Sequence, residues 1–185
     1  SGGTGSGFSA LLEDETRMST VFEAFVLNFF KQEQEAYQAS ADYVRWDAAD
    51  LPSELARYLP TMRTDITLRS ATKIIIIDAK FYKETFQAYR GGPPRIRSAH
   101  LYQLMTYLTH AQRMDPARRP VEGVLLYPSV DGQETSLSYV LAGHHLQVCT
   151  VDLSRPWQQI HQRIIGLCPE HAVRSAAQQQ RSVEA

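Results

Sequence analysis

The stretch Lys73-Ile-Ile-Ile-Ile-Asp-Ala-Lys80 decides the fold. Four consecutive isoleucines favour a strand that is covered on both faces, because a strand with one wet face would alternate apolar and polar residues. A strand of this kind lies in the middle of a sheet. The run ends abruptly in Asp78-Ala79-Lys80, so charged groups follow directly on a continuous apolar strand.

The segment before this strand, residues 62–69, alternates between apolar and polar side chains, which is the period of a half-buried strand. A hairpin with its turn centred between Ala71 and Thr72 would set Asp65 directly opposite Asp78. A slip of one residue would turn Asp65 to the other face, so the register decides whether the two carboxylates meet.

Two carboxylates that face each other repel, and a divalent cation turns this repulsion into coordination. Asp78 and Lys80 share a strand face, with the carbonyl of Ala79 between them. Phosphodiester hydrolysis needs hard oxygen ligands for Mg²⁺ and a positive group near the transition state, and Asp65, Asp78 and Lys80 supply this set. The alternative is that these are ordinary solvated charges at strand ends.

The remaining pattern predicts helices and further strands around this hairpin, with Ser98 and Ser154 as helix caps. Their order indicates an α/β domain with a central mixed β-sheet flanked by helices. The expected helices cover Ser19 or Thr20 to about Gln34, 98–113 and 155–165, and the expected strands cover 43–46, 122–127, 136–141 and 146–152.

Composition and charge limit the function classes. The 185 residues are 43% hydrophobic and 21% charged, and no apolar run approaches the roughly 20 residues of a membrane span, so we expect no membrane association. The net charge of −1 means that the whole-molecule field would not hold DNA, which would need a local basic patch or a partner. Cys149 and Cys168 lack metal-ligand spacing, which fits a reducing cytoplasmic compartment.

The composition divides the chain into three segments. Residues 1–15 begin with a Gly- and Ser-rich linker-like stretch, residues 16–172 form the domain, and residues 173–185 are expected to be a flexible tail. The glycine-rich opening lacks the Gly-Lys-Ser/Thr ending of a phosphate-binding loop, so we expect this chain to bind no nucleotide.

Seven segments between about Met18 and Ile165 carry a resemblance to a known family. They are Tyr43-Val-Arg-Trp-Asp47, Leu59-Pro-Thr-Met-Arg-Thr-Asp-Ile-Thr-Leu-Arg-Ser70, Lys73-Ile-Ile-Ile-Ile-Asp-Ala-Lys-Phe-Tyr-Lys83, Leu101-Tyr-Gln-Leu-Met-Thr-Tyr-Leu108, Leu125-Leu-Tyr-Pro128, Val148-Cys-Thr-Val-Asp-Leu153 and Trp157-Gln-Gln-Ile-His161. The chain resembles the PD-(D/E)xK nuclease superfamily and, more narrowly, the C-terminal nuclease half of the McrC family. It departs from the superfamily formula at Thr64, where proline is usual, and at Asp78, where glutamate is common.

The resemblance implies a restriction-endonuclease-like fold and a Mg²⁺-dependent endonuclease that cuts double-stranded DNA, with Mn²⁺ as a substitute. It implies that Asp65, Asp78 and the Ala79 carbonyl bind the metal and that Lys80 positions the attacking water or supports the transition state. It also implies a partner, the GTP-hydrolysing AAA+ subunit McrB, which recognises methylated cytosine. The family's N-terminal half, which docks on that motor, is expected to be missing here.

Three further residues are candidates for supporting the site. Glu23 lies at the edge of the first apolar helix stripe, where it could approach the metal, although Thr20 and Glu23 also have the spacing of a capping box. Gln103 and Tyr107 resemble the Gln-x-x-x-Tyr element of RecB-like nucleases. The alternative for this pair is a half-buried tyrosine whose hydroxyl binds a neighbouring amide.

Lys83, Arg90, Arg95 and Arg97 lie in or beside a Gly- and Pro-rich stretch, which predicts a mobile basic loop that could contact DNA phosphates. An ordinary solvated loop is the alternative. Two other functions stay open at this point: a catalytically silent DNA-binding or assembly scaffold with the same fold, and a RecB-like nuclease of another system.

Overall fold

The computed structural model describes residues 4–81, 95–129 and 134–168. Their helices and strands follow the order α1 (Thr4–Gln32), β1 (Gln38–Ser40), β2 (Tyr43–Val44), α2 (Ser53–Ala56), β3 (Met62–Arg63), β4 (Ile66–Arg69), β5 (Ile74–Ala79), α3 (Ser98–Met114), β6 (Val121–Ser129), β7 (Ser136–Leu141), β8 (His144–Asp152) and α4 (Trp157–Ile165). None of the helices in these residues is both long and apolar enough to cross a membrane.

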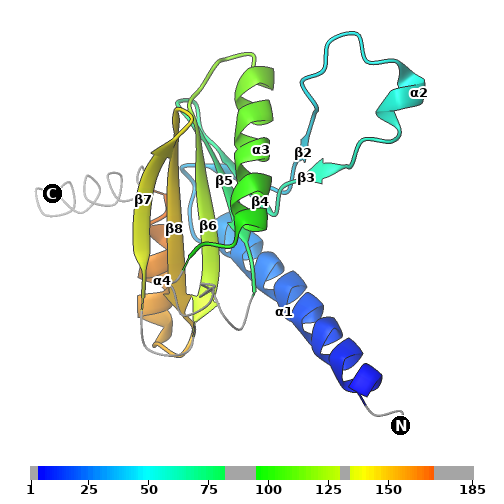
Figure 1. The fold of residues 1–185 in the computed structure, drawn as a ribbon. Helices are drawn as coiled ribbons and strands as arrows, with labels where there is room; N and C mark the ends of the chain where they lie inside the picture. Colours follow the sequence, from blue (N-terminus) through cyan, green and yellow to red (C-terminus); the bar gives the residue numbers. More distant parts are fainter. Residues whose placement is uncertain (1–3, 82–94, 130–133, 169–185) are drawn as a thin grey trace, which may run out of the picture.

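Six strands form the main sheet in the order β1-β4-β5-β6-β8-β7 (Figure 1). The central strands β5, β6 and β8 run parallel, while β1, β4 and β5 pair antiparallel and β7 pairs antiparallel with β8. The prediction of a mixed α/β domain is confirmed. The expected strand 136–141 is observed with the same bounds, and the two others around it are longer than expected.

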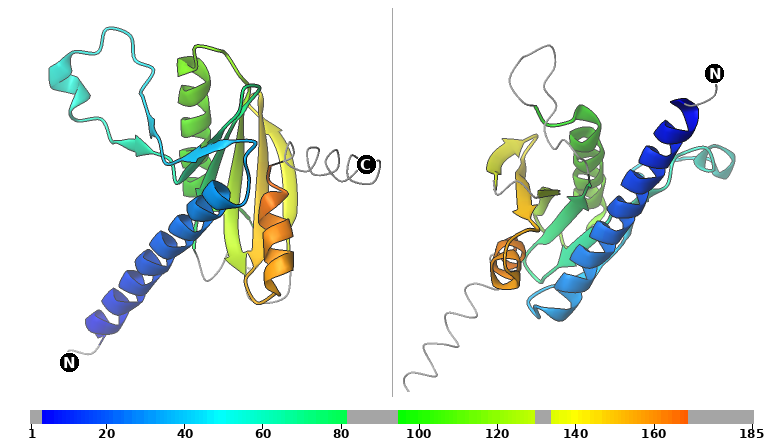
Figure 2. Two further views of the ribbon diagram at one scale, coloured as in Figure 1. Left: turned by 180° about the vertical axis from the view of Figure 1, so that it is seen from behind. Right: turned by 90° about the horizontal axis from the view of Figure 1, so that it is seen from below.

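Helices cover both faces of this sheet, with α1 and α4 on one face and α3 on the other (Figures 1 and 2). All six residues of β5 are buried, as predicted for a central strand. Ile75 and Ile77 belong to the core under α1 and α4. Ile74 and Ile76 belong to the core under α3. The isoleucine run therefore joins the two apolar layers through a single strand.

The stretch predicted as one strand, residues 62–69, is broken at Thr64 and Asp65. Before the break, β3 pairs with β2 in a separate two-stranded sheet, and the chain between them projects away from the main sheet with α2 (Figures 1 and 2). After the break, β4 lies inside the main sheet, because β1 forms the edge. The expectation that this strand is half-buried is therefore wrong, and Thr67 is buried.

The first helix is longer than the pattern predicted, since it begins at Thr4 and not at Ser19 or Thr20. Glycine disfavours a helix by roughly 1 kcal/mol per residue but does not exclude one. The Gly- and Ser-rich composition therefore did not prevent the helix from extending into residues 4–18. The buried stripe consists of Phe22, Val26, Phe29 and Phe30. The division into linker, domain and tail stays a prediction, and residues 173–185 lie outside the described residues.

Both predicted helix caps are wrong. The helices α3 and α4 follow Arg97 and Pro156, and neither helix has a side-chain cap hydrogen bond. Ser154 instead donates its hydroxyl to Oδ1 of Asp152 at 2.6 Å and closes the turn after β8. Serine forms local hydrogen bonds in turns as well as at helix N-caps. The position of a serine before an apolar run therefore does not distinguish a cap from a turn.

Candidate metal-dependent nuclease site

The hairpin that carries the candidate residues has the predicted register. Ile66 pairs with Ile77, so Asp65 directly precedes the first paired residue of β4 and Asp78 directly follows its partner in β5. The turn contains no glycine. It is held by Ser70, whose Oγ accepts hydrogen bonds from the backbone N–H groups of Thr72 and Lys73 at 3.2 and 3.1 Å.

Thr64 fixes the approach to Asp65. Its backbone N–H donates to the carbonyl of Asp42 at 2.9 Å, and its hydroxyl accepts from the backbone N–H of Asp42 at 2.9 Å. The hydroxyl also lies 2.8 Å from Oγ1 of Thr67. A proline at this position could not donate the first of these bonds, so the departure from the superfamily formula has a structural use here.

Three predicted catalytic groups converge at the end of this hairpin. Oδ2 of Asp65 accepts a hydrogen bond from the backbone N–H of Ala79 at 3.0 Å. The ammonium of Lys80 lies 3.1 Å from Oδ1 of Asp78 and 3.7 Å from Oδ2 of Asp65. The two carboxylates therefore share one counter-charge, and both strands of the hairpin are tied together at the site.

Asp78 is the most unusual of these groups. It is 1% exposed, and both of its carboxylate oxygens are buried. Oδ1 is met by the Lys80 ammonium at 3.1 Å, whereas Oδ2 forms no hydrogen bond with the described residues. Burial raises its pKa to about 7, against the opposing charge of Lys80, and the charge of Asp65 adds to the rise. A buried acid whose only neighbouring cation is shared with a second acid is costly unless something else binds it.

Lys80 carries the opposite balance. Burial lowers the pKa of its ammonium, but the carboxylates of Asp78 and Asp65 outweigh that effect, so its pKa is raised above the ordinary value. Lys80 is therefore a charged donor at neutral pH, held within reach of both acids.

Glu23 reaches the site from α1. Its pKa is raised first by burial and then by the charge of Asp65, so the two carboxylates are close enough to repel. Oγ of Ser19 donates to Glu23 at 3.3 Å. The capping-box alternative is wrong, because Thr20 lies inside the helix and donates its hydroxyl to the carbonyl of Thr16 at 3.1 Å.

Gln103 and Tyr107 extend the site along α3. Nε2 of Gln103 donates to the Tyr107 hydroxyl at 2.8 Å, which is the amide pairing that the structural alternative required. Burial is the main cause of the raised pKa of Tyr107, and the charges of Asp78, Lys80 and Asp65 also act on that hydroxyl. The pair is thus both internally bonded and within electrostatic range of the three catalytic candidates.

Sequence reasoning missed His100, which is buried on α3 beside Lys80. Its Nδ1 lies 2.9 Å from the hydroxyl of Tyr127. Burial, followed by the charges of Lys80 and Arg97, lowers its pKa to about 4, so the imidazole is neutral at pH 7. A signal was present, because His100 lies three and seven residues before Gln103 and Tyr107 and so shares their helix face.

Two cavities meet at these residues. One of about 390 Å³ lies between α1 and α3 and is lined by Lys80, His100 and Gln103 as well as Glu23. The other, of about 250 Å³, lies between α1 and the β3–β4 junction and is lined by Arg63 and Asp65 as well as Glu23. An extended ligand that passes over Glu23 would occupy both.

The donors present suit a hard cation. No group of three or more His, Cys, Asp or Glu side chains that could hold a metal by themselves occurs in the part of the chain that the structure describes. Asp65 and Asp78 with the Ala79 carbonyl leave positions for water or phosphate oxygens, which is how Mg²⁺ is usually bound. Oδ2 of Asp78, which forms no hydrogen bond with the described residues, fits such an ion.

The predicted basic loop is only partly visible. Lys83 and Arg90 lie outside the described residues. Arg95 is exposed, and Arg97, directly before α3, is near enough to His100 to lower its pKa. The structure therefore brings Arg97 to the margin of the site and leaves the DNA-contact role of all four residues a prediction.

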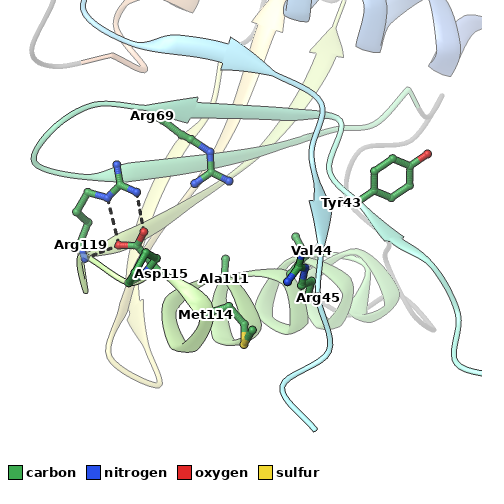
Figure 3. Close-up of a pocket in the computed structure, with 9 residues that line it drawn as sticks. Tyr43, Val44, Arg45, Arg69, Ala111, Met114, Asp115 and Arg119 are labelled. Atoms are coloured by element: carbon green, nitrogen blue, oxygen red, sulfur yellow. Dashed lines mark hydrogen bonds and ion pairs between the residues drawn. The ribbon is translucent and has the colours of Figure 1, made fainter. Parts of the chain in front are cut away.

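A further cavity, of about 310 Å³, lies between β2 and the end of α3 (Figure 3). Arg119 forms an ion pair with Asp115 at 2.6 Å, and Arg69 forms one with Asp42, also at 2.6 Å. Arg119 also donates to the carbonyl of Ser70 at the hairpin turn. These contacts join the far end of the hairpin to α3, away from Asp78.

Comparison with known proteins gives the family. A family profile for the McrBC 5-methylcytosine restriction system component matches residues 10–128, which include all three catalytic candidates. The chain is 35% identical over 158 residues to the type IV methyl-directed restriction enzyme EcoKMcrBC of Escherichia coli strain K12, a match that covers 85% of this chain and 44% of that relative. The chain thus spans less than half the length of that relative. Both findings confirm the resemblance in sequence, and the chain belongs to the McrBC 5-methylcytosine restriction system component family.

Proposed function

We propose that this chain is the metal-dependent DNA endonuclease domain of a methylation-dependent restriction system. The observation that carries the proposal is the buried Asp78 carboxylate, which faces Asp65 and is met by the Lys80 ammonium at Oδ1, while its Oδ2 forms no hydrogen bond with the described residues. Family membership supports the restriction role, and the site supports the chemistry.

The residues of the site have distinct tasks in this proposal. Asp65 and Asp78 hold Mg²⁺ together with the Ala79 carbonyl, and Glu23 adds negative charge from α1. Lys80 keeps its proton and donates to the attacking water or to the charge that develops on the phosphate. The hydrogen bond from the Ala79 backbone N–H to the Asp65 carboxylate holds the two strands in register during the reaction.

The metal supplies two effects when bound, a lowered pKa of a coordinated water and stabilisation of charge on the phosphate oxygens, and Mn²⁺ can replace Mg²⁺ in this chemistry. Gln103 and Tyr107 line or border the same space from α3, where a hydroxyl and an amide can bind the substrate backbone.

The partner in this proposal is a GTP-hydrolysing AAA+ subunit of the McrB kind. The chain has a net charge of −1, so its overall field does not favour DNA, and a motor that brings DNA to the site would supply the missing affinity. Recognition of methylated cytosine then belongs to that partner and not to the hairpin described above.

Reconstitution tests this proposal. The protein is combined with its AAA+ partner and GTP, and linear DNA that is methylated or unmethylated is supplied with Mg²⁺. We expect cleavage only of methylated DNA and only with the wild-type protein, while Asp78→Asn assembles equally but does not cut. Equal cleavage by Asp78→Asn would assign the chemistry elsewhere and leave this domain a scaffold.

A further inference from the structure

The cavity of about 250 Å³ beside the site contains an arginine with no assigned role. Arg63 is the last residue of β3, two residues before Asp65, and lines this cavity together with Asp65 and Glu23. The pKa of Glu23 is raised by burial, and the charge of Arg63 offsets a small part of that rise, which places the guanidinium near the catalytic acids.

Arg63 also lacks an acidic partner. None of the ion pairs formed within the described residues includes it, and among the residues that line the two cavities at the site it is the one arginine. Its guanidinium lies 5.9 Å from the ring centroid of Tyr43, the residue opposite it in β2. The guanidinium is therefore supported by an aromatic ring, and its hydrogen-bond donors stay available to a ligand.

The two cations that line the paired cavities differ in this respect. Lys80 is held between Asp65 and Asp78, so its charge is already balanced. Arg63 is exposed and lines the cavity that Asp65 and Glu23 also line. In a chain with a net charge of −1, a cation that lines the site and is not neutralised attracts a polyanion to that site.

We propose that Arg63 binds a backbone phosphate of the DNA, next to the phosphate at which the strand is cut. This inference rests on the proposed nuclease function. A guanidinium suits the task because its planar fork donates two parallel hydrogen bonds to phosphate oxygens, and the Tyr43 ring limits the orientations that it can take. The Thr64 bonds to Asp42 fix the backbone between Arg63 and Asp65, so a phosphate held by the first is positioned relative to the second.

Binding without catalysis tests this subsite. Fluorescence anisotropy with a short labelled DNA duplex in EDTA compares the wild-type chain with Arg63→Gln, Arg63→Lys and Arg118→Gln at several salt concentrations. Arg118 is the matched control, because it is an exposed arginine in the turn after α3 and lines neither cavity. Thermal melts confirm that each variant folds.

We expect Arg63→Gln to weaken DNA binding roughly tenfold, the size of one charge-assisted pair of hydrogen bonds. The slope of log K against log salt should become shallower by about 0.9, because one phosphate contact is lost. Arg63→Lys should keep the wild-type slope and recover only part of the affinity, since it keeps the charge without the fork.

Equal affinity and equal slope for Arg63→Gln and the wild type would overturn the subsite, as would an equal loss in Arg118→Gln or no DNA binding by the wild type at low salt. These outcomes are independent of cleavage. A chain that binds DNA through Arg63 and never cuts it keeps the subsite and loses the nuclease. A chain that cuts DNA while Arg63→Gln binds normally keeps the nuclease and loses the subsite.

Discussion

The Lys80 ammonium lies 3.1 Å from Oδ1 of Asp78, yet that carboxyl has a pKa raised to about 7. Burial of Asp78 thus outweighs the attraction of a neighbouring positive charge. An acid in this position opposes folding whenever it is ionised without a further cation, and folding alone gives no reason to keep it. The cost is consistent with a site that is completed by a metal ion.

The first prediction concerns pH in EDTA. The pKa of Asp78 in the folded chain, about 7, is above the ordinary value of 3.8, so the folded state holds the proton more tightly. Its contribution to stability is full below pH 4 and is lost as the pH rises through 7. Asp78→Asn removes this dependence. Urea denaturation should show the variant gaining roughly 2 kcal/mol or more over the wild type between pH 4 and pH 8. A constant difference across this range would contradict the burial effect.

The second prediction concerns metal binding measured by thermal shift. Mg²⁺ or Mn²⁺ should raise the melting temperature of the wild type more at pH 8 than at pH 6, because protons compete with the metal for Asp78. Asp78→Asn should abolish this rise. Asp50→Asn, the same change on an exposed carboxyl, should keep it. A rise of equal size in both variants would remove Asp78 from the metal site.

The features that could be predicted from the sequence depend on contacts between residues that are close together in the chain. The isoleucine run predicted the central strand, because a strand that is apolar on both faces must be covered on both faces. The hairpin register was predictable because the turn and both strands are adjacent in the chain. The convergence of Asp65, Asp78 and Lys80 follows from these two local facts.

The parts that escaped prediction depend on distant partners. The predicted strand 62–69 is interrupted at Thr64, which forms hydrogen bonds with Asp42, a residue 22 positions away. His100 owes its place to Tyr127, which is 27 positions away on β6. Arg63 is brought to Glu23 by a cavity that α1 and β3 enclose together, although the two residues lie far apart in the sequence. No local pattern contains these pairings.

The third prediction concerns Glu23. Glu23→Gln keeps the size and shape of the side chain and removes the charge that Asp65 repels. Cleavage should fall roughly tenfold at limiting Mn²⁺ and recover in part at higher Mn²⁺, because a supporting carboxylate acts on metal affinity. Asp14→Asn, the loss of an exposed carboxylate on the same helix that lines neither cavity, is the control and should cut like the wild type. An identical Mn²⁺ dependence of Glu23→Gln and the wild type would give Glu23 a structural role only.

The fourth prediction concerns the contact between α3 and β6. A Cβ at Gly123 would lie 2.8 Å from Cδ1 of Leu108 and 3.1 Å from Cδ2 of Leu104, both fully buried. Gly123→Ala should therefore lower the free energy of unfolding by roughly 1–3 kcal/mol in urea denaturation. Adding Leu108→Val, which removes one methylene, should recover part of the loss. Wild-type stability of Gly123→Ala would mean that α3 is not seated this closely.

The fifth prediction is the most direct test of the central claim that Asp65, Asp78 and Lys80 form a nuclease site. The purified chain and Lys80→Ala, prepared identically, are incubated with supercoiled plasmid and Mn²⁺ at low salt and high protein concentration. Lys80→Ala should lose cleavage while its circular dichroism spectrum is unchanged, because it lacks the cation that faces both acids. Nicked or linear plasmid with the wild type and none with Lys80→Ala is the predicted result. Cleavage at the same rate by both proteins would contradict the assignment.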